Sequence, residues 1–151
     1  MRRKDKEITT RSGIDEIINT AEVCRLAFAK DNEPYLVPVS FGYDGENIFV
    51  HTAREGKKIE FLKLNNRVCF EFETDAKIVG HDTIGCKWTA SFKSVIGFGK
   101  MIKITDEAEA MNALNQIMLK YSGKEWDFTN KDLNRVYLWK IEIDEISGKK
   151  S

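Results

Sequence analysis

The stretch that decides the fold is Ile48-Phe-Val-His-Thr-Ala-Arg-Glu-Gly-Lys-Lys-Ile-Glu-Phe-Leu-Lys-Leu-Asn65, whose pattern predicts a strand, a tight turn and a helix. It opens with Ile, Phe and Val, which strands prefer. Thr52 is followed three residues later by Glu55, a spacing typical of a capping box, so we expect Thr52 to be the helix N-cap. Three apolar residues at helical spacing are expected to face the core: Ile59, Phe61 and Leu62.

A phosphate would fit at this turn. The first turn of a helix has unpaired backbone N–H groups and the positive end of the helix dipole, and Lys57 and Lys58 add two charges. Gly56 lets a ligand approach the backbone, whereas Glu55 would repel a phosphate unless its carboxylate points away. The alternative is a plain amphipathic helix with solvated lysines, because charge runs usually mark exposed faces.

Length and composition favour one domain over residues 1–151, with a charged arm at 1–10 and a polar tail at 148–151. Lys plus Arg and Asp plus Glu are 24 each, so the formal charge is zero, which argues against a general nucleic-acid or membrane-surface binder. Cys24, Cys69 and Cys86 are odd in number and widely spaced, which favours a reducing cytoplasm. The charged start has no long apolar run, so we expect neither signal peptide nor membrane span.

Strands and helices are expected to alternate in a meander. A helix opened by Ser12 is expected at 13–21, and one capped by Asp106 and ended by Gly123 is expected at 107–121. Strands are expected at 23–29, 35–43, 48–50, 67–74, 87–93, 95–104 and 136–146, with a loop at 75–85. These six or seven strands with three inserted helices predict an α+β, mainly β fold built on a small antiparallel barrel.

Two features within the strands predict curvature and a ligand wall. Pro38 cannot donate to a strand ladder, so its strand should lie at an edge, at a bulge or against a ligand, which makes residues 37–40 a candidate wall. Gly97 and Gly99 allow sharp bending or close packing of another surface.

Several other chemistries find little support. His81, Cys86 and Cys69 match no metal-ligand spacing, so we expect no metal, and no Gly-rich nucleotide loop is present. The basic residues from Arg54 to Lys63 lack the interleaved aromatics of a nucleic-acid surface. His51 ends a strand just before the proposed phosphate turn. It could contact a bound ring or supply a proton, or simply be satisfied by packing.

Taken together, these residues make the chain resemble the pyridoxamine-5′-phosphate-oxidase-related FMN-binding proteins, and within them the nitroimidazole-resistance (Nim-like) branch. The resemblance covers almost the whole chain and rests on the order and spacing of five segments: residues 1–8, 24–27, 35–43, 51–58 and 94–100.

The resemblance implies a split β-barrel homodimer with FMN at the subunit interface. Thr52, Lys57 and Lys58 would match the phosphate ligands, and His51 would lie near the flavin. The resemblance places further residues along or near the flavin ring, the last two from the partner or a neighbouring strand: Val37, Pro38, Val39, Ser40, Trp88 and Ser94. Gly56 and Lys57 replace a serine and an arginine of the true oxidases, and their C-terminal arginine-bearing motif is absent, so pyridoxamine phosphate is not the expected substrate.

The function implied by the resemblance is an FMN-dependent oxidoreductase that passes electrons from an NAD(P)H donor to a small acceptor such as a nitroaromatic or nitroimidazole. FAD is the alternative cofactor, and His51 is the candidate catalytic residue. A flavin-binding carrier or redox sensor without turnover is the alternative function, and a small-barrel nucleic-acid binder is a third.

Overall fold

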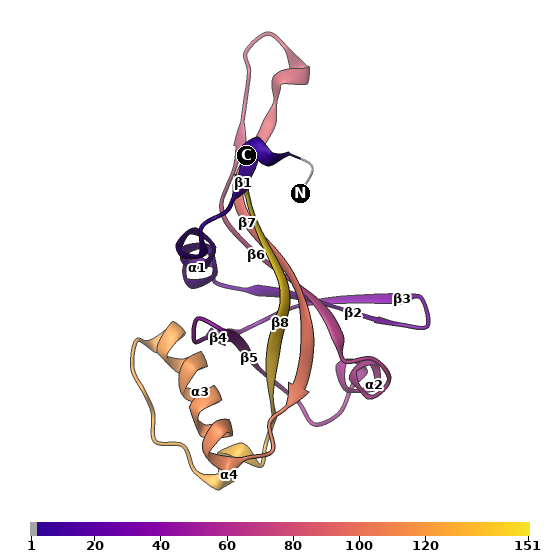
Figure 1. Cartoon of the computed structure of the whole chain (residues 1–151), viewed down its shortest axis with the longest axis vertical. Coiled ribbons are helices and arrows are strands. Elements are labelled where there is room, and N and C mark those ends of the chain that lie inside the picture. Colours follow the sequence, from indigo (N-terminus) through magenta and orange to yellow (C-terminus); the bar gives the residue numbers. More distant parts are fainter. Residues whose placement is uncertain (1–2) are drawn as a thin grey trace.

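An antiparallel sheet of eight strands forms the body of the molecule in a computed structural model that describes residues 3–151 (Figure 1). Its order is β3-β2-β6-β7-β8-β5-β4, with β1 paired to β8. The strands are β1 Glu7–Ile8, β2 Cys24–Lys30, β3 Glu33–Val39, β4 Phe41–Tyr43, β5 Asn47–Thr52, β6 Arg67–Val79, β7 Thr89–Lys103 and β8 Tyr137–Lys150. The helices are α1 Arg11–Thr20, α2 Lys57–Leu64, α3 Glu107–Ser122 and α4 Asn130–Leu133, with single 3-10 turns at η1 Lys4–Lys6 and η2 Gly85–Lys87.

The sheet curls into a half-barrel because its central strands pack closely at glycines. A Cβ on Gly97 would lie 2.2 Å from Cζ of Phe70 and 2.6 Å from the carbonyl oxygen of Glu145. A Cβ on Gly99 would lie 2.3 Å from the carbonyl oxygen of Glu142, and the β7–β8 register shifts between Phe98 and Gly99. The curvature predicted from these two glycines is confirmed.

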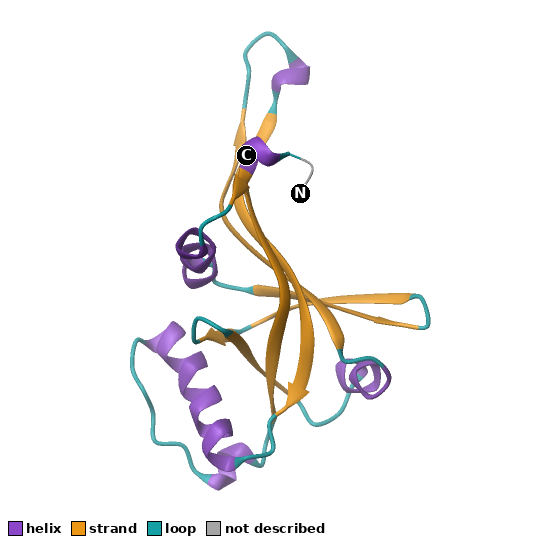
Figure 2. Ribbon diagram, in the orientation of Figure 1, coloured by secondary structure: helices purple, strands orange, loops and turns teal. Residues whose placement is uncertain are grey.

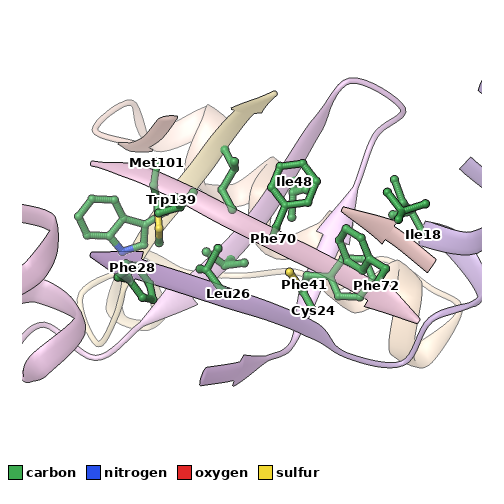
Figure 3. Close-up of a cluster of buried hydrophobic side chains, with 14 of the residues drawn as sticks. Ile18, Cys24, Leu26, Phe28, Phe41, Ile48, Phe70, Phe72, Met101 and Trp139 are labelled. Atoms are coloured by element: carbon green, nitrogen blue, oxygen red, sulfur yellow. The ribbon is translucent and has the colours of Figure 1, made fainter. Parts of the chain in front are cut away.

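The main core fills the inside of this curl (Figure 3). Phe41 and Phe72 have ring centroids 4.7 Å apart, and Phe70 and Phe72 have centroids 5.9 Å apart. Residues from α1 and β2 close the cluster, among them Ile18 and Leu26, which are almost fully buried. A second cluster lies under α3 and comprises Phe49, Ile104, Ala110, Ala113, Ile117 and Leu138.

The ends of α1 and α3 follow local capping chemistry, with a correction to the predicted cap of α1. Asp106 caps α3 by accepting from the backbone N–H of Glu109 (2.8 Å), and Gly123 ends it with φ +71°, as predicted. Helix α1 is capped by Thr10 and not by Ser12, because the backbone is still extended at Thr10 and its Oγ1 accepts from Gly13 N–H (3.3 Å).

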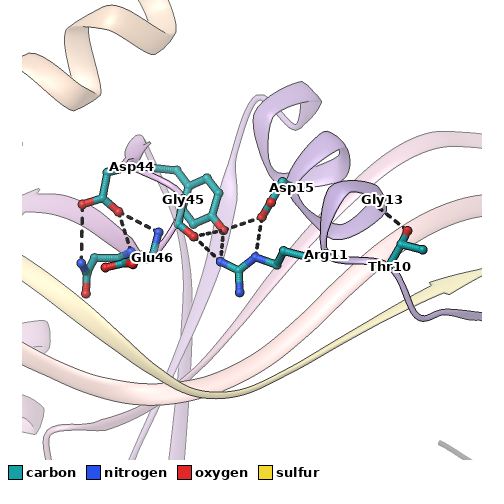
Figure 4. A network of polar contacts seen from close by, with 9 residues as sticks. Thr10, Arg11, Gly13, Asp15, Asp44, Gly45 and Glu46 are labelled. Carbon is teal, nitrogen blue, oxygen red and sulfur yellow. Dashed lines mark hydrogen bonds and ion pairs between the residues drawn. The ribbon is translucent and has the colours of Figure 1, made fainter.

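A polar network fastens α1 to the turn between β4 and β5 (Figure 4). Tyr43 Oη donates to Asp15 Oδ1 (2.7 Å), and Arg11 Nε donates to the same oxygen (2.9 Å). Arg11 also donates to Tyr43 Oη and to the carbonyl oxygen of Gly45. Burial, followed by the bond to Asp15, raises the pKa of Tyr43 to about 12.

Several predicted element boundaries were wrong. The expected strand 35–43 breaks at Ser40 into β3 and β4, and the expected strands 87–93 and 95–104 form one strand, β7. Strand β6 continues to Val79 because its ladder with β7 resumes beyond a register shift after Thr74. Strand β8 extends to Lys150, and α4 was not predicted.

Figure 2 shows the long β6–β7 hairpin projecting from the body. No helix in residues 3–151 combines the length and apolarity that a bilayer crossing requires.

Candidate functional site

The turn between β5 and α2 is exposed to solvent. Residues 53–56 are exposed, and Gly56 is the N-cap of α2 with φ +110° and without a side-chain cap. Nothing lies within 4 Å of the position that a Cβ on Gly56 would take. The start of α2 therefore has no capping side chain and nothing blocks the backbone at Gly56, as an anion site requires.

Thr52 is not the N-cap of α2, which corrects the capping-box prediction. It is the last residue of β5, where it pairs with Tyr137 of β8 and is 4% exposed. Its Oγ1 accepts from Nε1 of the buried Trp139 at 2.9 Å. The β5–β8 ladder extends through Thr52, so the Thr52 hydroxyl accepts from a buried indole N–H and is not available as a helix cap. Glu55 precedes the first residue of α2 and lies in the exposed turn.

Lys57 joins α2 to the β2–β3 hairpin. Its Nζ lies 2.6 Å from Glu33 Oε1 at the start of β3, and the hydrogen bond to this carboxylate raises the pKa of Lys57. The same ammonium lies 5.0 Å from the ring centroid of Tyr35 and 5.5 Å from that of Phe61. Lys57 thus already has an anionic partner within the chain.

Lys58 and His51 lie near each other at the opening of the turn. His51 is the penultimate residue of β5 and its surface is exposed, while Lys58 is half-buried. Desolvation by surrounding protein atoms, followed by the charge of Lys58, lowers the pKa of His51. The lowered pKa favours the neutral imidazole, which can both donate and accept a hydrogen bond.

The proposed ligand wall lies on the edge strand β3. Pro38 is exposed and pairs in register with Arg25 of β2. Of the three predicted alternatives, an edge, a bulge or a ligand contact, the structure shows the edge position. Val37 and Val39 are half-buried against the core, whereas Pro38 and Ser40 are exposed. The Lys57–Glu33 ion pair links α2 directly to this strand.

Trp88 and Ser94 lie elsewhere in the chain. Trp88 follows η2 in the β6–β7 hairpin, is 58% exposed, and donates from Nε1 to the carbonyl oxygen of His81 (2.9 Å). Ser94 is buried in β7, opposite Glu73 and Lys149. Figure 1 shows this hairpin at the opposite end of the sheet from α2. One chain therefore does not bring Trp88 to the turn.

Three residues beside the turn were not predicted as site residues. The guanidinium carbon of Arg54 lies 5.2 Å from the ring centroid of Tyr137, and Lys103 Nζ lies 3.5 Å from it. The alternation of the last strand signals that Tyr137 lies on its apolar face, but no local pattern shows that β8 pairs with β5.

Comparison with known proteins identifies the fold and the family. Similar structures include the FAD and heme binding protein of Mycobacterium smegmatis (TM-score 0.83, 20% identity, 97% of this chain and 73% of that one). An FAD-binding protein of Mesorhizobium loti matches with TM-score 0.70 and 22% identity, over 97% of both chains. The fold is therefore the split β-barrel of flavin-binding proteins. The sequence profile of the pyridoxamine 5′-phosphate oxidase family matches residues 10–150, and the chain belongs to this family.

Within the family, a structure from Bacteroides thetaiotaomicron VPI-5482 is 31% identical, with TM-score 0.85 over 95% of this chain and 86% of that one; it is provisionally described as a 5-nitroimidazole antibiotic resistance protein. A curated, uncharacterized protein of Rhizobium meliloti (strain 1021) is 23% identical over 64 residues, which is 42% of each chain. The match thus spans less than half of that relative.

Proposed function

We propose that this protein is an FMN-dependent oxidoreductase that reduces a small organic acceptor. The observation that carries the proposal is the uncapped start of α2 beside Gly56, open to a ligand, with Lys58 next to it and His51 at the end of the adjoining strand. When bound, a flavin supplies the hydride and electron transfer that this reaction needs.

The backbone N–H groups of Lys57 and Lys58 and the ammonium of Lys58 would hold the flavin phosphate. A helix start and a lysine charge are the usual donors to phosphate groups. Lys57 would act mainly through its N–H, because its ammonium is engaged by Glu33. Its side chain ties α2 to the start of β3, the strand that carries residues 37–39.

His51 would orient the flavin or hold a proton beside it. As a neutral imidazole it can donate from one ring nitrogen and accept at the other. Its exposed surface leaves it accessible to a bound ligand.

Nitroaromatic compounds are the acceptor class we propose, with a nicotinamide dinucleotide as the electron donor. Support comes from the 31% identical protein of Bacteroides thetaiotaomicron VPI-5482, which is described as a 5-nitroimidazole antibiotic resistance protein. FAD is the alternative cofactor, since similar structures from Mesorhizobium loti and Mycobacterium smegmatis are FAD-binding proteins. A flavin carrier or redox sensor without turnover is the second candidate function, because these relatives are named for binding alone.

A second copy of the chain would complete the site. The outer face of β7 exposes Ile96, Phe98 and Ile102, and the hairpin exposes Ile78 and Trp88, so large exposed apolar side chains follow β7 along its length. Covering these residues would stabilise a dimer.

We place the protein in the cytoplasm, a proposal supported by its three free cysteines.

The first experiment is the visible spectrum of the protein purified without added cofactor, followed by titration with FMN. Lys58→Gln should weaken FMN binding roughly tenfold or more, because a hydrogen bond to a charged group contributes about 1.5–3 kcal/mol. Lys63→Gln, on the same helix but in its last turn, is the matched control. A protein without flavin bands that also fails to bind FMN would overturn the proposal.

Oxidation of NADPH or NADH by the flavin-loaded protein, with a nitroaromatic or a quinone as acceptor, then separates the two candidates. Steady turnover supports the oxidoreductase, and its absence with both donors supports the carrier or sensor.

Light scattering tests the dimer: Ile96→Glu should yield monomers, whereas Leu119→Glu on α3 should not. A monomeric wild type at micromolar concentration would refute the dimer.

A further inference from the structure

A pocket of about 370 Å³ is lined by the end of β7, the start of β8, the start of α3 and helix α4. These elements meet in the lower part of Figure 1. Arg54, Lys103 and Tyr137 line one wall. The apolar part of its lining comes from Ile104, Ala110 and Leu138, which are buried, and from Leu133 and Val136, which are half-buried. The pocket thus combines a cationic wall with a smaller apolar floor formed by these side chains.

In the part of the chain that the structure describes, no carboxylate lies within ion-pair distance of the two cations of this wall. Both lie over the Tyr137 ring, and within residues 3–151 neither Arg54 nor Lys103 forms an ion pair with a carboxylate. Other basic residues do so, for example Arg25 with Glu71 at 2.9 Å. Two neighbouring cations repel each other, so an anion between them and the solvent would be favourable.

Two acidic residues also line the pocket and limit the charge that a ligand can carry. Asp106 lines the pocket but is already used as the α3 cap. Glu107 is exposed in the first turn of α3 and lines the pocket as well. A ligand with a single negative charge would be attracted by Arg54 and Lys103. A second negative charge on the ligand would be repelled by Glu107.

We propose that this pocket binds a small organic monoanion, with its carboxylate at Arg54 and Lys103 and its apolar body on the floor. Guanidinium forks match carboxylates in shape, and lysine adds a point charge. The volume lies at the lower end of small-molecule sites, which suits an acid of about the size of benzoate. Exposed amides of Asn130 and Asn134 at the rim provide further donors and acceptors. The proposal does not rest on flavin binding at the turn.

Benzoate and its neutral isostere benzamide are the probes, titrated into the protein as purified and followed by NMR of backbone and side-chain amides. Benzoate should shift the side-chain amides of Asn130 and Asn134 and bind more tightly than benzamide. Lys103→Gln should raise the dissociation constant of benzoate about fivefold or more by removing one cation. Lys100→Gln, an exposed lysine of the same strand outside the pocket, should leave it unchanged.

Glu107→Gln supplies a test that does not disturb the contacts of Tyr137. It removes the repelling charge, so benzoate should bind more tightly to this variant. Equal binding of benzoate and benzamide, shifts confined to other parts of the chain, or equal weakening by Lys103→Gln and Lys100→Gln would each overturn the proposal. So would unchanged benzoate affinity in Glu107→Gln.

Discussion

Lys57 Nζ lies 2.6 Å from Glu33 Oε1, so the first residue of α2, which follows the proposed phosphate turn, is tied to the first residue of β3. The pair is exposed on both sides, and exposed pairs contribute little to stability. Its importance is positional, since it directs one of the two adjacent lysines toward the protein and away from an incoming anion.

The first prediction concerns this pair. Glu33→Gln should leave the melting temperature unchanged and tighten FMN binding a few-fold, because the freed ammonium of Lys57 can turn toward the phosphate. Titration calorimetry with FMN measures the effect. The double variant Glu33→Gln with Lys57→Gln should lose the gain; if it keeps the gain, Lys57 is not the group released.

The second prediction concerns the buried bond between Thr52 and Trp139. Thr52→Val removes the acceptor of a buried indole N–H and should lower the free energy of unfolding by about 1–3 kcal/mol. Urea denaturation measures this loss. Thr52→Ser keeps the hydroxyl and serves as control, so a loss as large as that of Thr52→Val would show that the methyl group, not the hydrogen bond, is important.

The third prediction concerns the curl of the sheet. Gly97→Ala places a Cβ 2.2 Å from Phe70 and against the Glu145 carbonyl, so overpacking should reduce the unfolding free energy by about 1–3 kcal/mol or more. Gly85→Ala has nothing within 4 Å of the new Cβ and should change it by less than about 0.5 kcal/mol. Urea midpoints compare the two, and equal midpoints would contradict the close packing.

The fourth prediction concerns the titration of His51. Its pKa in the folded protein is lowered, so the unfolded chain binds the proton more tightly and stability should fall as pH drops below about 6.5, the ordinary histidine value. The fall should level off below the folded pKa. His51→Gln should remove this component from urea midpoints measured across the range.

NMR titration of the histidine ring protons tests the cause of the shift. Lys58→Gln should raise the pKa of His51 part of the way to 6.5, because desolvation, the larger cause, remains. Lys63→Gln should leave it in place. An unchanged pKa in Lys58→Gln would mean that the two side chains do not interact.

Local sequence determined much of the fold. The helix after Asp106, the edge position of Pro38 and the bend at Gly97 and Gly99 were all predictable, since each depends on backbone chemistry within a few residues. The turn at Gly56 was located for the same reason. The break at Ser40 and the single long strand β7 were not predicted, because strand ends depend on the length of the partner strand.

Only the tertiary structure decided how the candidate site is assembled. The sequence offered Thr52 as a helix cap, but pairing of β5 with β8 made its hydroxyl the acceptor for Trp139, 87 residues away. The same pairing placed Tyr137 beside Arg54, the β7–β8 pairing placed Lys103 over the same ring, and the β2–β3 hairpin brought Glu33 to Lys57. A polar side chain with several possible partners binds the one that strand pairing brings next to it. Which strands pair is determined by burial of the whole apolar face of the sheet, not by the local sequence pattern.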